Sequence, residues 1–319
     1  MEHGYVVIKG AFTPEAAKEW TKDVWIRLGV DSEDRRQWNT ISDNLDRIHM
    51  PRHNTMSSKE FAPKAWGAIC ELLGEDRIEP KTQLWNDAFI VNLGRDEYKD
   101  LDIHPRDLEN WHVDGDFFVH FLDSPEQALL VIPLFSDIKH RGGATYISPE
   151  GLDHVAKYLA AHPEGCYPTG LSFTPSTGLD DPTQKYSLLE LANKKLTNFV
   201  ELTGDVGDVI LLHPLMLHSA SKNYIRSHRI ITNPPIALKS DRPFNFARDD
   251  PNEYSLVELK TLKALGVDRF EFKPTGERKL IVPKRVERQT ILYDQEKTRL
   301  EAHYGNMNGV QRAPLASRA

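Results

Sequence analysis

Hydrophobic residues near the start of the chain recur at the spacing of amphipathic helices. Residues 5–12 are rich in β-forming side chains, and Thr13 followed by Pro14 provides an N-cap with proline at the first helical position. A helix is expected to follow and to end at Gly29. Its predicted apolar face consists of Ala16, Ala17, Trp20, Val24 and Leu28. A second helix is predicted over residues 63–73, and both are expected to pack against a sheet.

From about residue 83 the pattern changes to short β-rich runs separated by Gly, Pro and Asp. These runs are AFIVNL (88–93), FFVHFL (117–122), ALLVIPLF (128–135), ATYIS (144–148), FVELT (199–203), DVILLHPLML (208–217) and RIITNPPIAL (229–238). Several short strands of this kind predict a sandwich or a double-sheet barrel. A helix over residues 151–161 and an insertion over about 162–198 interrupt them. A long insertion in a β-scaffold is often a lid or a binding loop.

The C-terminal part of the chain returns to a helical pattern. Leucines at 256, 259, 262 and 265 have helical spacing and precede Gly266, and a charged segment follows. We therefore predict a β-domain over residues 1–240 and a helical C-terminal extension over 241–319. The extension is expected to pack on the domain or on a partner subunit. In the second case the protein would be a homodimer.

Composition and charge narrow the class of protein. The 319 residues are 39% hydrophobic, enough for a packed core, and 40 basic against 47 acidic residues give a formal net charge of −7. No dense Lys/Arg cluster suggests nucleic-acid binding. The N-terminus lacks the pattern of a secretory signal, and no apolar run approaches the roughly 20 residues that span a bilayer. We expect a cytoplasmic protein without a membrane segment, whose two cysteines are thiols.

The stretch NWHVDGDFFVHF, residues 110–121, is the first candidate for chemistry. Side chains two apart on a strand point the same way, so His112 and Asp114 can face one cavity. They would supply two of the three ligands of the facial triad that holds non-haem iron. A third ligand is expected from residues 204–235, where His213 and His218 lie five residues apart and would point to opposite faces of a strand.

The segment HPLMLHSASKN, followed by Arg229, resembles the distal motif of the phytanoyl-CoA dioxygenase family of Fe(II)/2-oxoglutarate oxygenases. The resemblance implies that His218 completes the iron site with His112 and Asp114, and that Arg229, eleven positions after His218, binds 2-oxoglutarate. EHGYVVIKGAFTPEAA, WHVDG and HRGGATYISPEG resemble other family segments in the same order, so that the resemblance covers roughly residues 3 to 235.

That resemblance also implies a fold and a set of cofactors. The fold is a mainly β double-stranded β-helix, a jelly roll of the cupin-like kind, with flanking helices. The cofactors are Fe(II), the co-substrate 2-oxoglutarate and O2, with ascorbate as reductant. Thr145 and Ser221, together with Asn223, are candidates for contacts to the co-substrate, although a local hydrogen bond explains each of them equally well.

The expected function is oxidation of an unactivated C–H bond in a small metabolite, with release of succinate and CO2. The reaction would be hydroxylation, desaturation or oxidative ring formation, in specialised metabolism. Two alternatives are a non-catalytic small-molecule-binding protein and a metal enzyme that needs no oxo acid. Arg229 discriminates against the second, because a buried arginine without a carboxylate partner is costly.

Two further residues of the same stretch have competing interpretations. A metal site built from His112, Asp114 and His120 requires a turn at Gly115, since eight residues of extended strand span roughly 26 Å. Asp116 is either a substrate contact or a capping residue.

Overall fold

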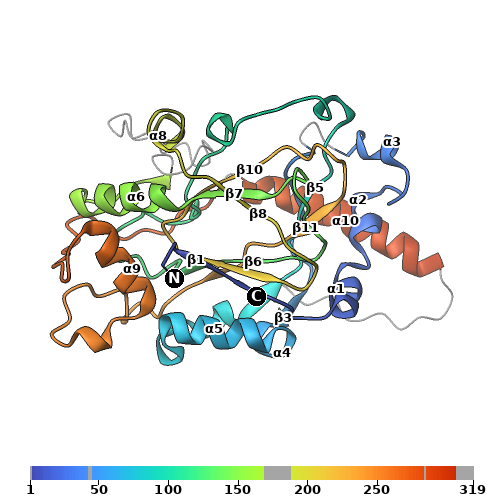
Figure 1. Ribbon diagram of the computed structural model, residues 1–319. Coiled ribbons are helices and arrows are strands. Elements are labelled where there is room, and N and C mark those ends of the chain that lie inside the picture. Colours follow the sequence, from blue (N-terminus) through green and yellow to red (C-terminus); the bar gives the residue numbers. More distant parts are fainter. Residues whose placement is uncertain (1, 42–44, 169–187, 284, 307–319) are drawn as a thin grey trace.

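The computed structural model describes residues 2–41, 45–168, 188–283 and 285–306. Within them, short antiparallel strands form the centre of the molecule and helices cover it (Figure 1). The strands are β1 Tyr5–Ile8, β2 Ile48–His49, β3 Thr55–Ser57, β4 Leu84–Asn86, β5 Ile90–Asn92, β6 Leu129–Pro133, β7 Thr145–Ser148, β8 Val200–Leu202, β9 Val209–Leu212, β10 Leu217–Ala220, β11 Arg229–Ile231 and β12 Pro235–Ile236. The helices are α1 Pro14–Thr21, α2 Val24–Leu28, α3 Arg35–Trp38, α4 Ser58–Phe61, α5 Pro63–Leu73, α6 Pro149–Ala161, α8 Leu188–Lys195, α9 Leu256–Leu265 and α10 Arg285–Asn306.

Four sheets are built from these strands, and their orders are β1-β9-β6-β12, β10-β7-β8, β11-β5-β2 and β3-β4. In the largest sheet Leu211 of β9 lies opposite both Val6 of β1 and Val131 of β6. Strand β6 is buried at every position, so both of its faces are covered. This explains why its sequence is continuously apolar instead of alternating.

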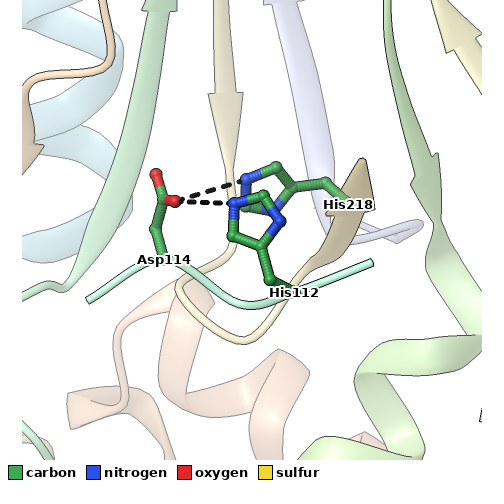
Figure 2. A group of neighbouring side chains, drawn as sticks. All are labelled: His112, Asp114 and His218. Carbon is green, nitrogen blue, oxygen red and sulfur yellow. Dashed lines mark hydrogen bonds and ion pairs between the residues drawn. The ribbon is translucent and has the colours of Figure 1, made fainter. Parts of the chain in front are cut away.

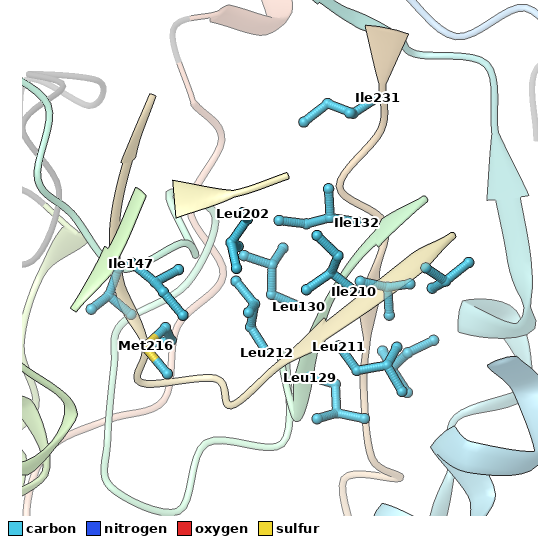
Figure 3. Close-up of a cluster of buried hydrophobic side chains, with 14 of the residues drawn as sticks. Leu129, Leu130, Ile132, Ile147, Leu202, Ile210, Leu211, Leu212, Met216 and Ile231 are labelled. Atoms are coloured by element: carbon cyan, nitrogen blue, oxygen red, sulfur yellow. The ribbon is translucent and has the colours of Figure 1, made fainter. Parts of the chain in front are cut away.

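The core lies between the largest sheet and the two three-stranded sheets. Figure 3 shows Leu130 and Ile132 of β6 and Leu212 of β9 directed toward Ile147 of β7 and Leu202 of β8. All five are at most 3% exposed. Truncating such a side chain to alanine typically costs about 2–5 kcal/mol. The core therefore fixes the strands that line the candidate site.

Most of the predicted strands form where the apolar runs indicated, but the run at 117–122 does not. Gly115 has a φ of +123° and begins a turn, and a Cβ there would lie 2.6 Å from the rings of both Phe118 and His120. Two of these residues make isolated bridges instead, Phe118 with Leu280 and His120 with Cys166.

The run at 208–217 was predicted as one strand, and this prediction is wrong. It contains β9 and β10, which belong to different sheets and are separated by residues 213–216, beginning with His213 and Pro214. Proline has no N–H to donate to a ladder, so the pairing of β9 ends there. The chain crosses from one sheet to the other at this point, which gives His213 and His218 different surroundings.

Both predicted N-terminal helical segments contain helices, but the first segment is not one continuous helix. Helix α5 spans the predicted residues and ends at Gly74, whose φ is +86°. The single helix expected up to Gly29 is instead two, α1 and α2, separated at Lys22 and Asp23. The break turns α2 onto α10, where Tyr304 donates a hydrogen bond to the Asp23 carboxylate.

The described part of the C-terminal extension packs on the same chain. Helix α9 begins with a capping box of Ser255 and Glu258 and packs against α6, while α10 packs against α2. The predicted leucine face of α9 is only partly buried, since Leu256 and Leu259 are 40% and 42% exposed. The buried side of α9 carries the polar residues Glu258 and Thr261, which have partners in the domain.

The predicted insertion at 162–198 falls largely on residues 169–187, which lie outside the described residues; α8 belongs to its described end. No helix in the described ranges combines the length and apolar character needed to cross a membrane.

Candidate metal centre

His218 lies on strand β10 and points into a cavity between the sheets. Side chains alternate along a strand, so His218 and Ala220 line the cavity, while Ser219 and Ser221 point away from it. His218 pairs with Ile147 of β7, which belongs to the core. The ligand candidate is therefore carried by a strand that the core holds in place.

His112 and Asp114 come from the segment that runs beside β10. The backbone N–H of His112 donates to the His218 carbonyl at 2.9 Å, and the His218 N–H donates back to the His112 carbonyl at 3.0 Å. This antiparallel bridge brings the two imidazole ring centroids to 4.2 Å. Figure 2 shows both rings facing the carboxylate of Asp114, as the sequence interpretation of these three residues requires.

The potential ligand atoms of the three residues lie within 4.8 Å of one another. Asp114 Oδ1 is 3.1 Å from His112 Nε2 and 3.5 Å from His218 Nε2. Each Nδ1 faces a backbone carbonyl, that of Asn110 at 2.7 Å and that of Met216 at 3.0 Å. With Nδ1 as the donor to the carbonyl in both rings, Nε2 faces the carboxylate. Nε2 donates to Asp114 when its ring is protonated and offers a lone pair to a metal when its ring is neutral.

The second carboxylate oxygen is also held. The Asn233 amide donates to Asp114 Oδ2 at 3.0 Å, leaving Oδ1 for the imidazoles. Two imidazole nitrogens and one carboxylate oxygen, each oriented by a further hydrogen bond, fit a divalent transition metal that keeps open positions. This donor set and its supporting bonds are the structural basis for treating the cluster as a metal centre.

The electrostatics of the cluster favour a positive charge next to Asp114. Burial acts to raise the pKa of Asp114, but His218 and the hydrogen bonds from both imidazoles outweigh it and hold the pKa well below the ordinary value of 3.8. Burial likewise acts to lower the pKa of His218, yet the attraction of Asp114 raises it. Burial and the neighbouring His218 lower the pKa of His112. A divalent cation carries more positive charge than a proton and would stabilise the Asp114 carboxylate more strongly.

Arg229, on β11, lies in the wall of the same cavity, which encloses ≈ 510 Å³ including its open mouth. The residue is 2% exposed, and its Nε has no hydrogen-bond partner in the described part of the chain. Burial lowers the pKa of Arg229 to about 10, with a contribution from the nearby Arg47. A buried guanidinium without an anionic partner is costly, and a guanidinium binds carboxylates bidentately. The cavity therefore contains a site suited to a carboxylate.

The candidates for co-substrate contacts separate into two groups. Thr145, on β7, lines the cavity opposite Ala220 in the sheet register. Ser221 instead donates its hydroxyl to the Ala144 carbonyl at 2.8 Å, and Asn223 donates to the Asn92 carbonyl at 3.2 Å. Neither Ser221 nor Asn223 is among the described residues of the cavity wall.

His120 and His213, the competing histidines, lie outside the cluster. A turn does follow Asp114, but the Nε2 of His120 is bonded to the Gly115 carbonyl at 2.8 Å, and burial lowers the pKa of His120 to about 4. His213 lies under α9, with Nε2 3.0 Å from the Thr261 hydroxyl. Both are structural residues.

The structure adds residues that the sequence interpretation missed. Asn110 and Asn233 orient the ligands, and Arg47 and His49 of the β2 region line the cavity. Arg285 of α10 forms a two-bond ion pair with Asp116, at 2.6 and 2.9 Å. In the sequence, the two-residue spacing of Arg47 and His49 could have indicated that both side chains face the same side of a strand. The rest depends on contacts between distant segments.

Fold and site together define a sheet-rich protein with a candidate mononuclear metal centre of two histidines and one aspartate. No family model matches the chain, and no curated protein matches it. Solved structures give distant similarities. HygX from Streptomyces hygroscopicus, with nickel and 2-oxoglutarate bound, has 12% identity and a TM-score of 0.38 over 73% of this chain and 82% of that one.

Two other solved structures are similarly distant. The epimerase SnoN, in complex with Fe3+, alpha ketoglutarate and nogalamycin RO, has 13% identity and a TM-score of 0.35 over 73% of this chain and 78% of that one. The non-heme monooxygenase ThoJ, as a nickel complex, has 13% identity and a TM-score of 0.37 over 95% and 96%. Similarity at this level does not establish a shared reaction, so no residue role is transferred from these proteins.

Proposed function

We propose that this protein is an Fe(II)/2-oxoglutarate-dependent oxygenase that oxidises an unactivated C–H bond of a small molecule. One observation carries the proposal. Two oriented imidazoles and a carboxylate converge in one cavity, and the wall of that cavity holds a buried guanidinium that has no partner among the described residues. A site that binds only a metal has no need of Arg229. A site that binds a metal and an oxo acid needs both the three-residue cluster and a guanidinium for the carboxylate.

Each residue of the proposed site would have a distinct role. His112, Asp114 and His218 would hold the iron ion, and Arg229 would bind the carboxylate of 2-oxoglutarate far from it. With 2-oxoglutarate and O2, iron supplies the oxidising chemistry, and succinate and CO2 are the co-products. Thr145, in the wall of the same cavity, would donate to the co-substrate. The apolar side chains of Ile90, Leu130 and Ile132 would exclude water around the reacting C–H bond.

The proposal includes a fold and a reaction class. The three sheets around the cavity would be parts of a double-stranded β-helix of the phytanoyl-CoA dioxygenase kind. The reaction would be hydroxylation, desaturation or ring formation in specialised metabolism, with ascorbate as reductant.

Metal binding and succinate release test the function directly. We expect the purified protein to bind one Fe(II) per chain and to release succinate from 2-oxoglutarate when iron, ascorbate and O2 are present. His218→Ala should weaken metal binding by at least about 100-fold, beyond the effect of losing a residue that only orients a ligand. It should also abolish succinate release. His303→Ala, at an exposed histidine of α10, is the matched control and should behave as the unmodified protein.

Arg229→Ala separates this function from the alternatives. It should leave metal binding intact and weaken 2-oxoglutarate binding by about 10- to 100-fold, the value of a charge-assisted hydrogen-bond pair. Binding of metal and oxo acid without succinate release, across a broad substrate panel, would indicate a non-catalytic binding protein. Turnover that does not need 2-oxoglutarate would indicate an oxo-acid-independent enzyme.

A further inference from the structure

Arg47 is a second guanidinium in the wall of the candidate active site, and 2-oxoglutarate does not account for it. We propose that Arg47 binds a carboxylate of the primary substrate, so that the enzyme acts on small carboxylic acids. This inference rests on the proposed function and adds a substrate class to it.

The register of the third sheet places Arg47 on the cavity side. His49 of β2 lies opposite Ile90 of β5, and Ile90 lies opposite Ile231 of β11; all three line the cavity. Arg47 precedes His49 by two positions and therefore faces the same side, just as Arg229 precedes Ile231 by two. Two strand spacings, roughly 10 Å, separate the Arg47 and Arg229 backbones. The two guanidiniums thus occupy different parts of one wall.

Arg47 has no partner for its charge in the described ranges. No carboxylate there lies within 4 Å of its guanidinium, and no side chain there accepts a hydrogen bond from it. The neighbouring Asp46 pairs instead with Lys222 at 2.7 Å. Glu109, the other carboxylate that influences Arg47, is exposed. The guanidinium is half-buried, which makes the missing partner unfavourable.

The charges of the loaded site leave Arg47 in excess. An iron(II) ion, the Asp114 carboxylate, dianionic 2-oxoglutarate and Arg229 together have no net charge. Both carboxylates of 2-oxoglutarate are then used, one at the metal and one at Arg229. Arg47 adds one positive charge to this neutral set, and it is less buried than Arg229. A molecule that enters after the co-substrate would meet Arg47, and a carboxylate on it would neutralise the excess.

His49 supports the same subsite. His49 is partly open to solvent on the cavity side, and desolvation by the surrounding protein, together with the positive charges of Arg47 and Arg285, lowers the pKa of its imidazole. The imidazole is therefore neutral near pH 7 and offers one N–H next to the guanidinium. A carboxylate has two oxygens and can accept hydrogen bonds from both side chains.

The test uses protein loaded with redox-inert zinc(II) and 2-oxoglutarate, so that binding is measured without turnover. The probes are benzoate, hexanoate and N-acetylleucine, each compared with its primary amide by saturation-transfer NMR. We expect at least one acid to bind, and its amide to bind about 10-fold or more weakly. Arg47→Ala should abolish this difference between acid and amide. Arg52→Ala, at an exposed arginine five residues further on, should retain it.

Binding of 2-oxoglutarate to the Arg47 and Arg229 variants shows which of the two guanidiniums binds the co-substrate. Arg47→Ala should change 2-oxoglutarate affinity less than about 3-fold, whereas Arg229→Ala should reduce it by about 10-fold or more. Equal binding of acids and amides, no binding of any acid up to about 10 mM, or equal loss of 2-oxoglutarate in both variants would each overturn the proposal. Failure of the proposed function would look different, since Arg229→Ala would then leave 2-oxoglutarate affinity unchanged.

Discussion

At the scale of single residues, the hydrogen bonds of the two ring nitrogens distinguish the candidate ligand histidines from His213. His112 and His218 each face a backbone carbonyl with Nδ1 and direct Nε2 toward Asp114. His213 has both nitrogens occupied, because the Leu215 N–H donates to its Nδ1 and its Nε2 contacts Thr261. The Nε2 of His213 meets a neutral hydroxyl, and in the described part of the chain His213 belongs to no group of metal-ligating side chains, so it serves stability.

The stability of the protein should fall in acid partly because of His213. Burial lowers its pKa to about 3, against the hydrogen bond to the Val257 carbonyl, whereas the ordinary value is 6.5. Between these two pH values the unfolded chain binds a proton that the folded chain does not. The contribution of His213 is therefore fully present above pH 6.5 and is lost as the pH falls toward 3. Between pH 7 and pH 5 the loss is about 2 kcal/mol.

Denaturant unfolding at pH 7 and pH 5 measures this effect. His213→Gln, which retains a donor for Thr261, should show a fall in unfolding free energy about 2 kcal/mol smaller than that of the unmodified protein. His303→Gln, at an exposed position, should show the full fall. An unchanged pH dependence in His213→Gln would contradict the role assigned to this residue.

At the scale of elements, α10 is tied to the domain by hydrogen bonds and ion pairs along its length. Near its start, Arg285 pairs with Asp116, two residues after the candidate ligand Asp114. Further along, Glu296 is 3% exposed and accepts a hydrogen bond from Arg27 at 2.8 Å. Its Oε2 also lies 2.9 Å from His53 Nε2. A charged C-terminal segment thus becomes a helix that connects the N-terminal helices with the neighbourhood of the site.

Removing the buried carboxylate should loosen α10. Glu296→Ala leaves Arg27 with Asp87 as its remaining carboxylate partner, at 3.2 Å. We expect a loss of about 3 kcal/mol in unfolding free energy, the lower end of the cost of breaking a buried ion pair. Hydrogen exchange should rise across α10. Glu301→Ala, at an exposed glutamate of the same helix, should have an effect within about 0.5 kcal/mol, and an equal loss in both variants would contradict the anchoring role.

At the scale of the whole molecule, the candidate site lies where separate sheets meet. The cavity wall takes Leu130 from the largest sheet, Thr145 and His218 from the second, and Arg229 from the third. The candidate metal ligands come from β10 and from the segment that bridges to it. A ligand bound in the cavity would therefore contact all three sheets at once and stabilise the folded chain.

Metal and co-substrate should raise the melting temperature together. At a hundred times their dissociation constants, each stabilises the native state by about 2.7 kcal/mol. For a chain of this size we expect a rise of roughly 5 °C from the metal alone, with a further rise on adding 2-oxoglutarate. Scanning calorimetry with and without a chelator measures the change. A rise of equal size in His218→Ala would show that the metal binds somewhere else.

Local sequence alone determined much of this protein. The candidate set of His112, Asp114, His218 and Arg229 was chosen through the resemblance of its segments to a known family, and the structure brings the first three together. The apolar runs of β6 and β7 and the extent of α5 up to Gly74 follow from short-range patterns. Such features depend on residues close together in the chain, where periodicity, caps and turn residues act directly.

Tertiary structure decided the rest, because it depends on which distant segments meet. Only the crossing of the chain at Pro214 separated His213 from His218, and only the docking of α10 gave Glu296 and Arg285 their partners. The turn at Gly115 likewise returned His120 to a backbone carbonyl. Arg47 and Asn233 became parts of the cavity wall through sheet register, which one-dimensional spacing does not encode, since pairing is fixed by the packing of whole faces.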